Sequence, residues 1–270
     1  MDEGGAACSD AAAAVELQGE TMALAFDGIR VIDFTQVLAG PFATQQLAML
    51  GADVIKVEQP GVGDQTRQRL SADDPSSGIT PTFLTCNVGK RSLTLDLKHP
   101  RAVDIVRRLV ASADAVVENF RPGVMGRLGF DYEACRAIKS DIVYCSISGY
   151  GQAGPKSGVA AYDGAVQADS GMMSITGSPE SGPMRTGYMP VDMASALNAA
   201  FAISAALFRR MATGEGQHLD VAMMDTAVVM QAVQFARFFD TAEQPPLFGN
   251  RSPTGQPTAN VFRTSDGFLQ

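Results

Sequence analysis

Two patterns of hydrophobic and polar positions alternate along this chain: short β-branched runs and longer amphipathic stretches. The short runs predict buried strands at 29–34, 53–58, 92–97, 115–120, 142–148 and 217–222. The longer stretches predict helices at 39–50, 100–112, 162–172, 191–212 and 223–240. Strands that alternate with helices at close spacing form parallel βαβ units. The pattern therefore predicts an open α/β sheet with helices on both faces.

Polar, glycine-rich and proline-rich segments predict loops at 59–82, 149–159 and 174–190, and a further strand begins at 262–270. A loop as long as 59–82 is usually functional or mobile. The segment 149–154 (GYGQAG) satisfies a GxGxxG pattern, which is typical of dinucleotide sites when a helix opens at the third glycine. Pro155 and Gly158 interrupt such a helix, so we interpret this segment as a tight loop.

Composition narrows the class of protein. Of 270 residues, 46% are hydrophobic and 19% are charged, which excludes a disordered chain and allows a sizeable core. The net charge of −8 disfavours nucleic acid as the main partner, although a locally basic pocket for a small anion stays open. The chain has only two histidines, His99 and His218, far apart in sequence, so we expect no metal site.

The spacing of the cysteines and the length of the apolar runs indicate the cellular compartment of the protein. The four cysteines show no CxxC spacing, which predicts a reducing cytoplasm rather than a disulfide framework. The longest apolar run, 199–208, ends at two arginines and is too short to span a membrane, so no membrane partner is expected. The first 21 residues are acidic and alanine-rich without a positive region, which predicts a disordered extension rather than a signal peptide.

Several cationic side chains fall near predicted strand ends or turns, namely Lys90, Arg91, Lys98, Arg121 and Arg127. Ligands of doubly wound sheets gather beyond the carboxyl ends of strands, and both Lys and Arg suit phosphate. Ordinary solvated surface charge is the alternative explanation.

Two aspartates stand at predicted helix starts. Asp192 begins the long apolar helix, where it is either an N-terminal acid or a carboxylate nucleophile at the positive end of the helix dipole. Asp163, beside Tyr162, is a second candidate for a local helix cap. Spacing alone leaves both open.

Eight ordered blocks resemble a known family, the class III coenzyme A transferases, which include formyl-CoA transferase, related acyl-CoA transferases and racemases. They are LAFDGIRVIDF at 24–34, VLAGP at 37–41, LGADVIKVE at 50–58, GD at 63–64, NVGKRSLTLDLK at 87–98, VENFRPGVM at 117–125, SGYGQAGP at 148–155 and TGEGQ at 213–217. The likeness runs from about residue 24 to the end of the chain, and so many blocks in order make it specific.

The resemblance implies a Rossmann-like large domain over 24–245, preceded by a disordered extension at 1–23. A linker and the start of a smaller domain would occupy 246–270. The family is longer, so the resemblance implies a chain that is truncated at its carboxyl end. It also implies an interlocked homodimer that uses coenzyme A or acyl-CoA as a substrate, with no permanently bound cofactor.

The resemblance assigns site residues by motif. Asp192 aligns with the catalytic aspartate, which would form a covalent intermediate with the acyl group. The coenzyme A-binding positions are Val37, Leu38, Ala39, Gln59, Leu95, Asp96, Leu97, Lys98, Asn119, Phe120, Arg121, Arg127, Tyr162 and Asp163. Gln59 stands where some members have an arginine.

Three functions follow from the residues and the resemblance together. The first is an acyl-CoA:carboxylate coenzyme A transferase. The second is an α-methylacyl-CoA racemase-like enzyme, which is disfavoured because Tyr162 stands where that branch has a histidine, the natural group for proton transfer near neutral pH. The third is a truncated, non-catalytic chain that binds coenzyme A.

Overall fold

The computed structural model describes residues 23–67 and 79–270, so most of the expected N-terminal extension and part of the expected 59–82 loop lie outside the described residues. The chain divides into two compact units. The sheet unit comprises Met1–Ser146 and Ala196–Leu219, and the second unit comprises Ile147–Ser195 and Asp220–Gln270. The division at 245/246 implied by the resemblance stays a prediction.

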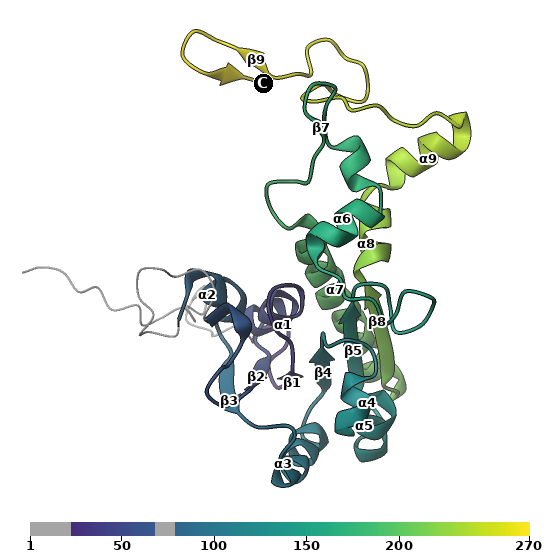
Figure 1. Ribbon diagram of the computed structural model, residues 1–270. Coiled ribbons are helices and arrows are strands. Elements are labelled where there is room, and N and C mark those ends of the chain that lie inside the picture. Colours follow the sequence, from purple (N-terminus) through teal and green to yellow (C-terminus); the bar gives the residue numbers. More distant parts are fainter. Residues whose placement is uncertain (1–22, 68–78) are drawn as a thin grey trace, which may run out of the picture. The chain divides into compact units, whose positions relative to one another are not determined.

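Six strands form one sheet in the order β3-β2-β1-β4-β5-β8 (Figure 1). Their bounds are Arg91–Thr94 (β3), Asp53–Glu58 (β2), Arg30–Asp33 (β1), Ala115–Glu118 (β4), Val143–Ser148 (β5) and Gln217–Ala222 (β8). The pairs β2–β3, β1–β2, β1–β4 and β4–β5 are all parallel. The expected parallel α/β sheet is confirmed, and the carboxyl ends of β1 to β4 lie at the same end of it.

Helices connect the strands, and the longer ones fall in the stretches where helices were predicted. They are α1 (Ala39–Met49), α2 (Pro81–Asn87), α3 (Pro100–Ala111), α4 (Val124–Leu128), α5 (Tyr132–Ile138), α6 (Asp163–Asp169), α7 (Pro190–Thr213), α8 (Met223–Met230) and α9 (Ala232–Thr241). Helix α3 buries Ala102, Val106 and Val110, which are four residues apart and so share one face. The last two join a core with Ile32, Val116 and other buried residues of the sheet. That core fixes the strand ends that carry the candidate site.

The structure differs from the sequence expectations at several short elements. Helices α4 and α5 follow the turn at 122–123, where no helix was expected. Both are only one or two turns long: α4 lies between two left-handed glycines, Gly123 and Gly129, and α5 is capped by Asp131. The expected loop at 174–190 contains a small hairpin, β6 (Gly177–Ser178) with β7 (Gly182–Pro183). The 262–270 segment forms another, β9 (Phe262–Arg263) with β10 (Phe268–Leu269).

Two expected helices of the second unit are interrupted. The stretch at 162–172 ends as α6 at Asp169 and continues after Gly171 as a short 3₁₀ helix, Met172–Ile175. The stretch at 223–240 divides into α8 and α9 at Gln231, whose side chain donates to Ala227 O at 2.9 Å and to Ser170 O at 3.2 Å. These hydrogen bonds satisfy the Ala227 carbonyl in α8 and the Ser170 carbonyl at the end of α6. A small core of Val166, Met172, Val191, Met223 and Ala227 holds the second unit together.

Helix α7 corrects the expectation that no segment is long enough to cross a membrane. Its 24 residues are long and apolar enough by length and composition, because the helix starts at Pro190, well before the apolar run at 199–208. The core helix of a globular protein passes the same test, so this property alone does not place α7 in a membrane.

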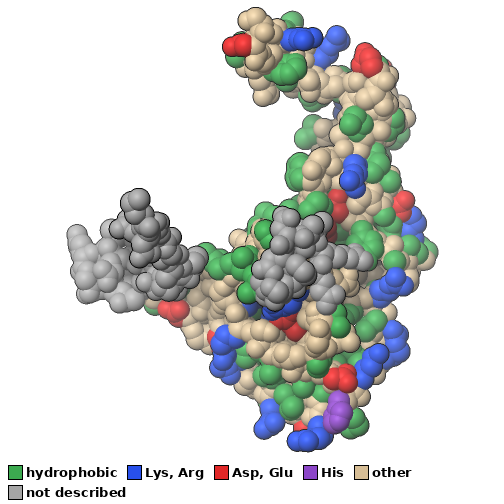
Figure 2. Space-filling view, turned by 60° about the vertical axis from the view of Figure 1, so that its left-hand side comes forward, with side chains coloured by type: hydrophobic (Ala, Val, Ile, Leu, Met, Phe, Trp, Pro, Cys, Tyr) green, Lys and Arg blue, Asp and Glu red, His purple; other side chains and the backbone are tan. Residues whose placement is uncertain are grey.

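The surface shown in Figure 2 carries Lys and Arg side chains interspersed with Asp and Glu and with hydrophobic side chains. The net charge of −8 therefore does not form a single acidic field on that face, and cations remain available there for a small anion.

Candidate functional site

The carboxyl ends of β1 to β4 gather the coenzyme A-binding positions expected in the sheet unit. Val37 and Leu38 lie between β1 and α1, and Ala39 begins α1. Gln59 follows β2, the segment 95–98 follows β3, and the segment 119–121 follows β4. Parallel strands place these positions at one end of the sheet, where doubly wound folds bind ligands.

The segment after β3 alternates between core and solvent. Leu95 and Leu97 pack against the hydrophobic core, whereas Asp96 and Lys98 are exposed. Asp96 accepts a hydrogen bond from the Lys98 N–H at 3.0 Å, which fixes the turn into α3. Of the predicted binding positions here, the two polar side chains are therefore the ones that a ligand can reach.

The segment after β4 divides in a similar way. Phe120 packs against the core, and Arg121, together with Arg127 on α4, is exposed. The Asn119 side chain is committed to the neighbouring loop: its Oδ1 accepts from Gln36 N–H and its Nδ2 donates to Gln36 O, both at 2.8 Å. Within the described part of the chain, no ion pair engages Lys98, Arg121 or Arg127.

The second unit brings Asp163 and Asp192 together at the start of α7. The Asp163 Oδ2 atom accepts hydrogen bonds from Val191 N–H at 2.8 Å and from Asp192 N–H at 3.0 Å. A carboxylate from α6 thus caps the amino end of α7, where the unpaired N–H groups and the helix dipole favour negative charge. Asp163 is 5% exposed, whereas Tyr162 beside it is 67% exposed.

The second oxygen of Asp163 is also occupied. Its Oδ1 atom accepts from Gln167 Nε2, one helical turn further along α6. The Gln167 Oε1 atom in turn accepts from Thr186 N–H at 3.0 Å. Gln167 was not expected as a site residue, but its position four residues after Asp163 in a helix is a signal that spacing carries.

This arrangement changes the acidity of Asp192. Burial and the charge of Asp163 raise the pKa of Asp192 from 3.8 to about 7. Such a carboxylate is a stronger base than that of an ordinary aspartate, yet in about half of the molecules it is ionised at neutral pH. Perturbed carboxyl groups of this kind are typical of catalytic acids, bases and nucleophiles.

Three buried side-chain atoms of the second unit lack a hydrogen-bond partner among the described residues: Ser148 Oγ, Gln152 Nε2 and Ser195 Oγ. Ser195 lies three residues after Asp192 on α7 and so shares a face of the helix with it. Sequence reasoning missed Ser195, because an orphaned hydroxyl is visible only in three dimensions. In the same described residues no three His, Cys, Asp or Glu side chains gather as a metal site would require.

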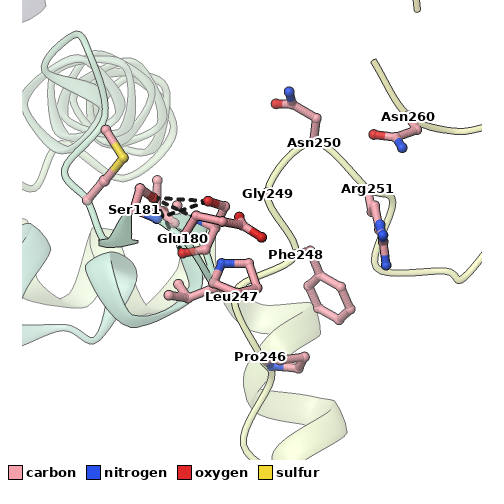
Figure 3. Close-up of a pocket in the computed structure, with 14 residues that line it drawn as sticks. Glu180, Ser181, Pro246, Leu247, Phe248, Gly249, Asn250, Arg251 and Asn260 are labelled. Atoms are coloured by element: carbon pink, nitrogen blue, oxygen red, sulfur yellow. Dashed lines mark hydrogen bonds between the residues drawn. The ribbon is translucent and has the colours of Figure 1, made fainter. Parts of the chain in front are cut away.

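A separate cavity of about 900 Å³ opens in the second unit between the β6–β7 hairpin and the segment 246–251 (Figure 3). Its labelled lining includes Glu180 and Arg251 as charged residues, Asn250 and Asn260 as amides, and Phe248 as an aromatic residue. None of the predicted site residues lines this cavity.

Comparison with known proteins gives a consistent result. The family model described as CoA-transferase family III matches residues 26–270. The chain belongs to CoA-transferase family III. It is 43% identical over 246 residues to a succinate–glutarate CoA-transferase of Agrobacterium fabrum, a match that covers 90% of this chain and 61% of that relative. It is 38% identical over 253 residues to a formyl-CoA:oxalate CoA-transferase of Rhodopseudomonas palustris, covering 87% of this chain and 59% of the relative.

A solved structure of a relative agrees with the fold. A CAIB/BAIF family protein from Brucella suis superposes with a TM-score of 0.86 at 38% identity, covering 92% of this chain and 65% of that chain. The resemblance inferred from the eight sequence blocks is thereby confirmed, as is the α/β fold. The chain spans about three fifths of the length of the relatives it matches.

Proposed function

We propose that this chain carries the coenzyme A-binding and nucleophilic part of an acyl-CoA:carboxylate CoA-transferase, with Asp192 as the nucleophile. The observation that supports this most directly is the placement of Asp192: it is half-buried at the start of α7, beside Asp163, with its pKa raised to about 7. Membership of CoA-transferase family III and the names of the relatives support the reaction class.

The proposed reaction proceeds by two rounds of acyl exchange on one carboxylate. A carboxylate oxygen of Asp192 attacks the thioester carbonyl of the donor, the C–S bond breaks, and coenzyme A leaves as its thiolate, so that a mixed anhydride forms. The thiolate then attacks the aspartyl carbonyl, which gives an aspartyl thioester and releases the donor acid as a carboxylate. The acceptor carboxylate and the thiolate repeat these two steps in reverse, which forms the new acyl-CoA and restores Asp192.

Asp163 supports this chemistry by its charge and by its position. A nucleophile whose pKa lies near the working pH combines high basicity with a large reactive fraction. The hydrogen bonds that Asp163 accepts from two backbone N–H groups also fix the first turn of α7. They therefore restrict the backbone position of the proposed nucleophile.

We propose that the sheet unit binds coenzyme A at the carboxyl ends of β1 to β4. Exposed Lys98, Arg121 and Arg127 supply positive charge for its phosphates. Helix α1 begins without a side-chain cap, so its first N–H groups suit an anion as well. The remaining predicted positions, including Tyr162 and Asp163, stay proposals. Coenzyme A at millimolar concentration should raise the melting temperature, and added salt should reduce that shift.

For the acceptor we propose a short dicarboxylate. The relatives named above are described by succinate, glutarate and oxalate, all of them dicarboxylates. Activity assays with dicarboxylates and with matched monocarboxylates would test this, since equal rates for both would contradict it.

We also propose a homodimer in the cytoplasm. Helix α7 exposes Leu197, Phe201, Phe208 and Met211 at helical spacing within the sheet unit, an apolar stripe that a second copy would cover. A Phe201→Ser/Phe208→Ser variant should sediment as a monomer at concentrations where the parent chain is dimeric. The three cysteines among the described residues are buried and form no disulfide, which fits a reducing compartment.

The decisive experiment traps the intermediate. Acyl-CoA with hydroxylamine should yield a hydroxamate at Asp192, identified by mass spectrometry, and Asp192→Ala should abolish both the adduct and transfer while coenzyme A binding persists. Exchange of the substrate α-proton without acyl transfer would favour the racemase reaction. Binding of coenzyme A without any adduct would favour a non-catalytic chain. Full transfer by Asp192→Asn would reduce Asp192 to a structural residue.

A further inference from the structure

The loop between β1 and α1 contains a strained residue. Val37 has φ = 73°, in the left-handed region, and it is one of two such non-glycine residues in the described part of the chain. A β-branched side chain is disfavoured there, so the conformation persists only where its surroundings impose it. Gly40 adds to the constraint, because a Cβ at that position would overlap the Thr35 side chain.

One buried ion pair holds the middle of this loop. The Lys56 side chain is 2% exposed, and its Nζ lies 2.9 Å from Asp64 Oδ2. The same Nζ donates to Thr35 O at 2.7 Å, and the Asp64 carboxylate accepts from Val37 N–H at 3.3 Å. The pair therefore contacts the backbone of the loop on both sides of Gln36.

A second buried pair holds the two ends of the loop. Lys90 Nζ lies 2.9 Å from Asp33 Oδ2, with 2% and 0% of these side chains exposed. Lys90 also donates to Pro41 O at 2.8 Å, and Asp33 Oδ1 accepts from Thr35 N–H at 2.8 Å. Burial opposes ionisation of Asp33, but the charges of Lys90 and Lys56 lower its pKa to about 2.

Asn119, the residue after β4, completes the arrangement. Both polar atoms of its side-chain amide bind the backbone of Gln36, one as acceptor and one as donor, at 2.8 Å. The residues Thr35, Gln36, Val37 and Pro41 thus each contact a polar side chain from another part of the sheet unit.

Two buried lysine–aspartate pairs contribute little to stability, because the cost of desolvation offsets most of the attraction within each pair. Their geometry is instead specific for one backbone conformation. We propose that Lys56–Asp64, Lys90–Asp33 and Asn119 are positioning residues that impose the left-handed turn at Val37, and that coenzyme A binds only to the loop in this conformation. The requirement of coenzyme A for this loop conformation rests on the proposed function.

A double-mutant cycle at Asn119 and Val37 tests this proposal in the full chain. Asn119→Ala removes both hydrogen bonds to Gln36 without leaving a buried charge, and it should weaken coenzyme A binding about tenfold in calorimetry. Glycine adopts the left-handed region freely, so in a Val37→Gly background the same change should cost less than about threefold. Both proteins with Val37→Gly lack the valine side chain. Its loss therefore cancels when the two are compared, and only the effect of Asn119→Ala remains.

Tyr144→Phe is a matched control for stability. It removes one buried hydrogen bond, from Tyr144 Oη to Phe130 O at 2.9 Å, in the same unit. It should lower the melting temperature to a similar degree and leave coenzyme A affinity unchanged. Hydrogen exchange of the 34–40 backbone amides in the ligand-free chain should be faster in Asn119→Ala and unchanged in Tyr144→Phe.

Unchanged affinity in Asn119→Ala, or an equal loss in both backgrounds, would overturn the proposal. Rapid exchange of the 34–40 amides in the parent chain would also overturn it, because the loop would then not be held. A parent chain that binds no coenzyme A would refute the proposed function separately, and the exchange rates would still decide whether these side chains hold the loop.

Discussion

Replacing Asp192 with asparagine removes the titrating group at the start of α7 and keeps the size of the side chain. Burial and the charge of Asp163 raise the pKa of Asp192 to about 7, against 3.8 for an ordinary aspartate. Between these values the folded chain retains a proton that the unfolded chain releases. The free energy of unfolding therefore falls as the pH rises through this window. About three pH units at about 1.4 kcal/mol each give about 4 kcal/mol, or about 3 kcal/mol after allowance for solvent screening of the half-buried group.

Urea denaturation of both proteins between pH 4 and pH 8, at one protein concentration, measures this effect. The Asp192→Asn variant should match the parent chain at pH 4 and be more stable by about 3 kcal/mol at pH 8. Asp169→Asn is a suitable control: hydrogen bonds from Lys156 and Tyr150 lower the pKa of Asp169, so its titration falls below this window. A difference between Asp192→Asn and the parent that stays constant over the whole range would refute the reasoning.

Three further outcomes follow from contacts already described. Asp163→Asn removes a negative charge beside Asp192, so the acid limb of the pH–rate profile should move to lower pH by about one unit, measured as kcat/KM. Lys90→Met leaves Asp33 buried without its partner and should cost about 3–5 kcal/mol in urea denaturation, part of which a second change, Asp33→Asn, should recover. Gly40→Ala should destabilise the chain by about 1–3 kcal/mol in spite of the helix propensity of alanine, because the added methyl group has no room; a stabilised variant would contradict the close approach there.

The β-branched runs and the helical spacing predicted the sheet and its main helices, because burial of an apolar face determines both. The break between α8 and α9 could not be predicted in this way. It occurs at Gln231, in a stretch without proline or glycine, and depends on a hydrogen bond to Ser170, which is distant in sequence. Helices of one or two turns, such as α4, have too few apolar positions to show a period.

The candidate site likewise combines features that the sequence predicts with features that it does not. Asp192 was recognisable as a candidate from its place at a predicted helix start and from its alignment with the family's catalytic aspartate. Lys56 falls within a predicted strand and was not among the predicted site residues. Its pairing with Asp64 was not predictable, because Asp64 reaches Lys56 from a loop whose path depends on the packed structure. The raised pKa of Asp192 likewise depends on Asp163, which lies 29 residues earlier in the sequence.

The sheet unit is discontinuous in sequence, and this bears on how the chain can be synthesised and divided. Its last segment, Ala196–Leu219, follows the first segment of the second unit. That segment supplies Arg210, whose guanidinium lies 2.7 Å from Asp114 Oδ1, and it begins β8, the neighbour of β5. A nascent chain that has emerged from the ribosome only as far as Ser195 therefore leaves β5 as an open edge strand and Asp114 without that cation. Completion of this unit must wait until about four fifths of the chain has been translated, and a fragment ending at Ser146 would expose the same edge.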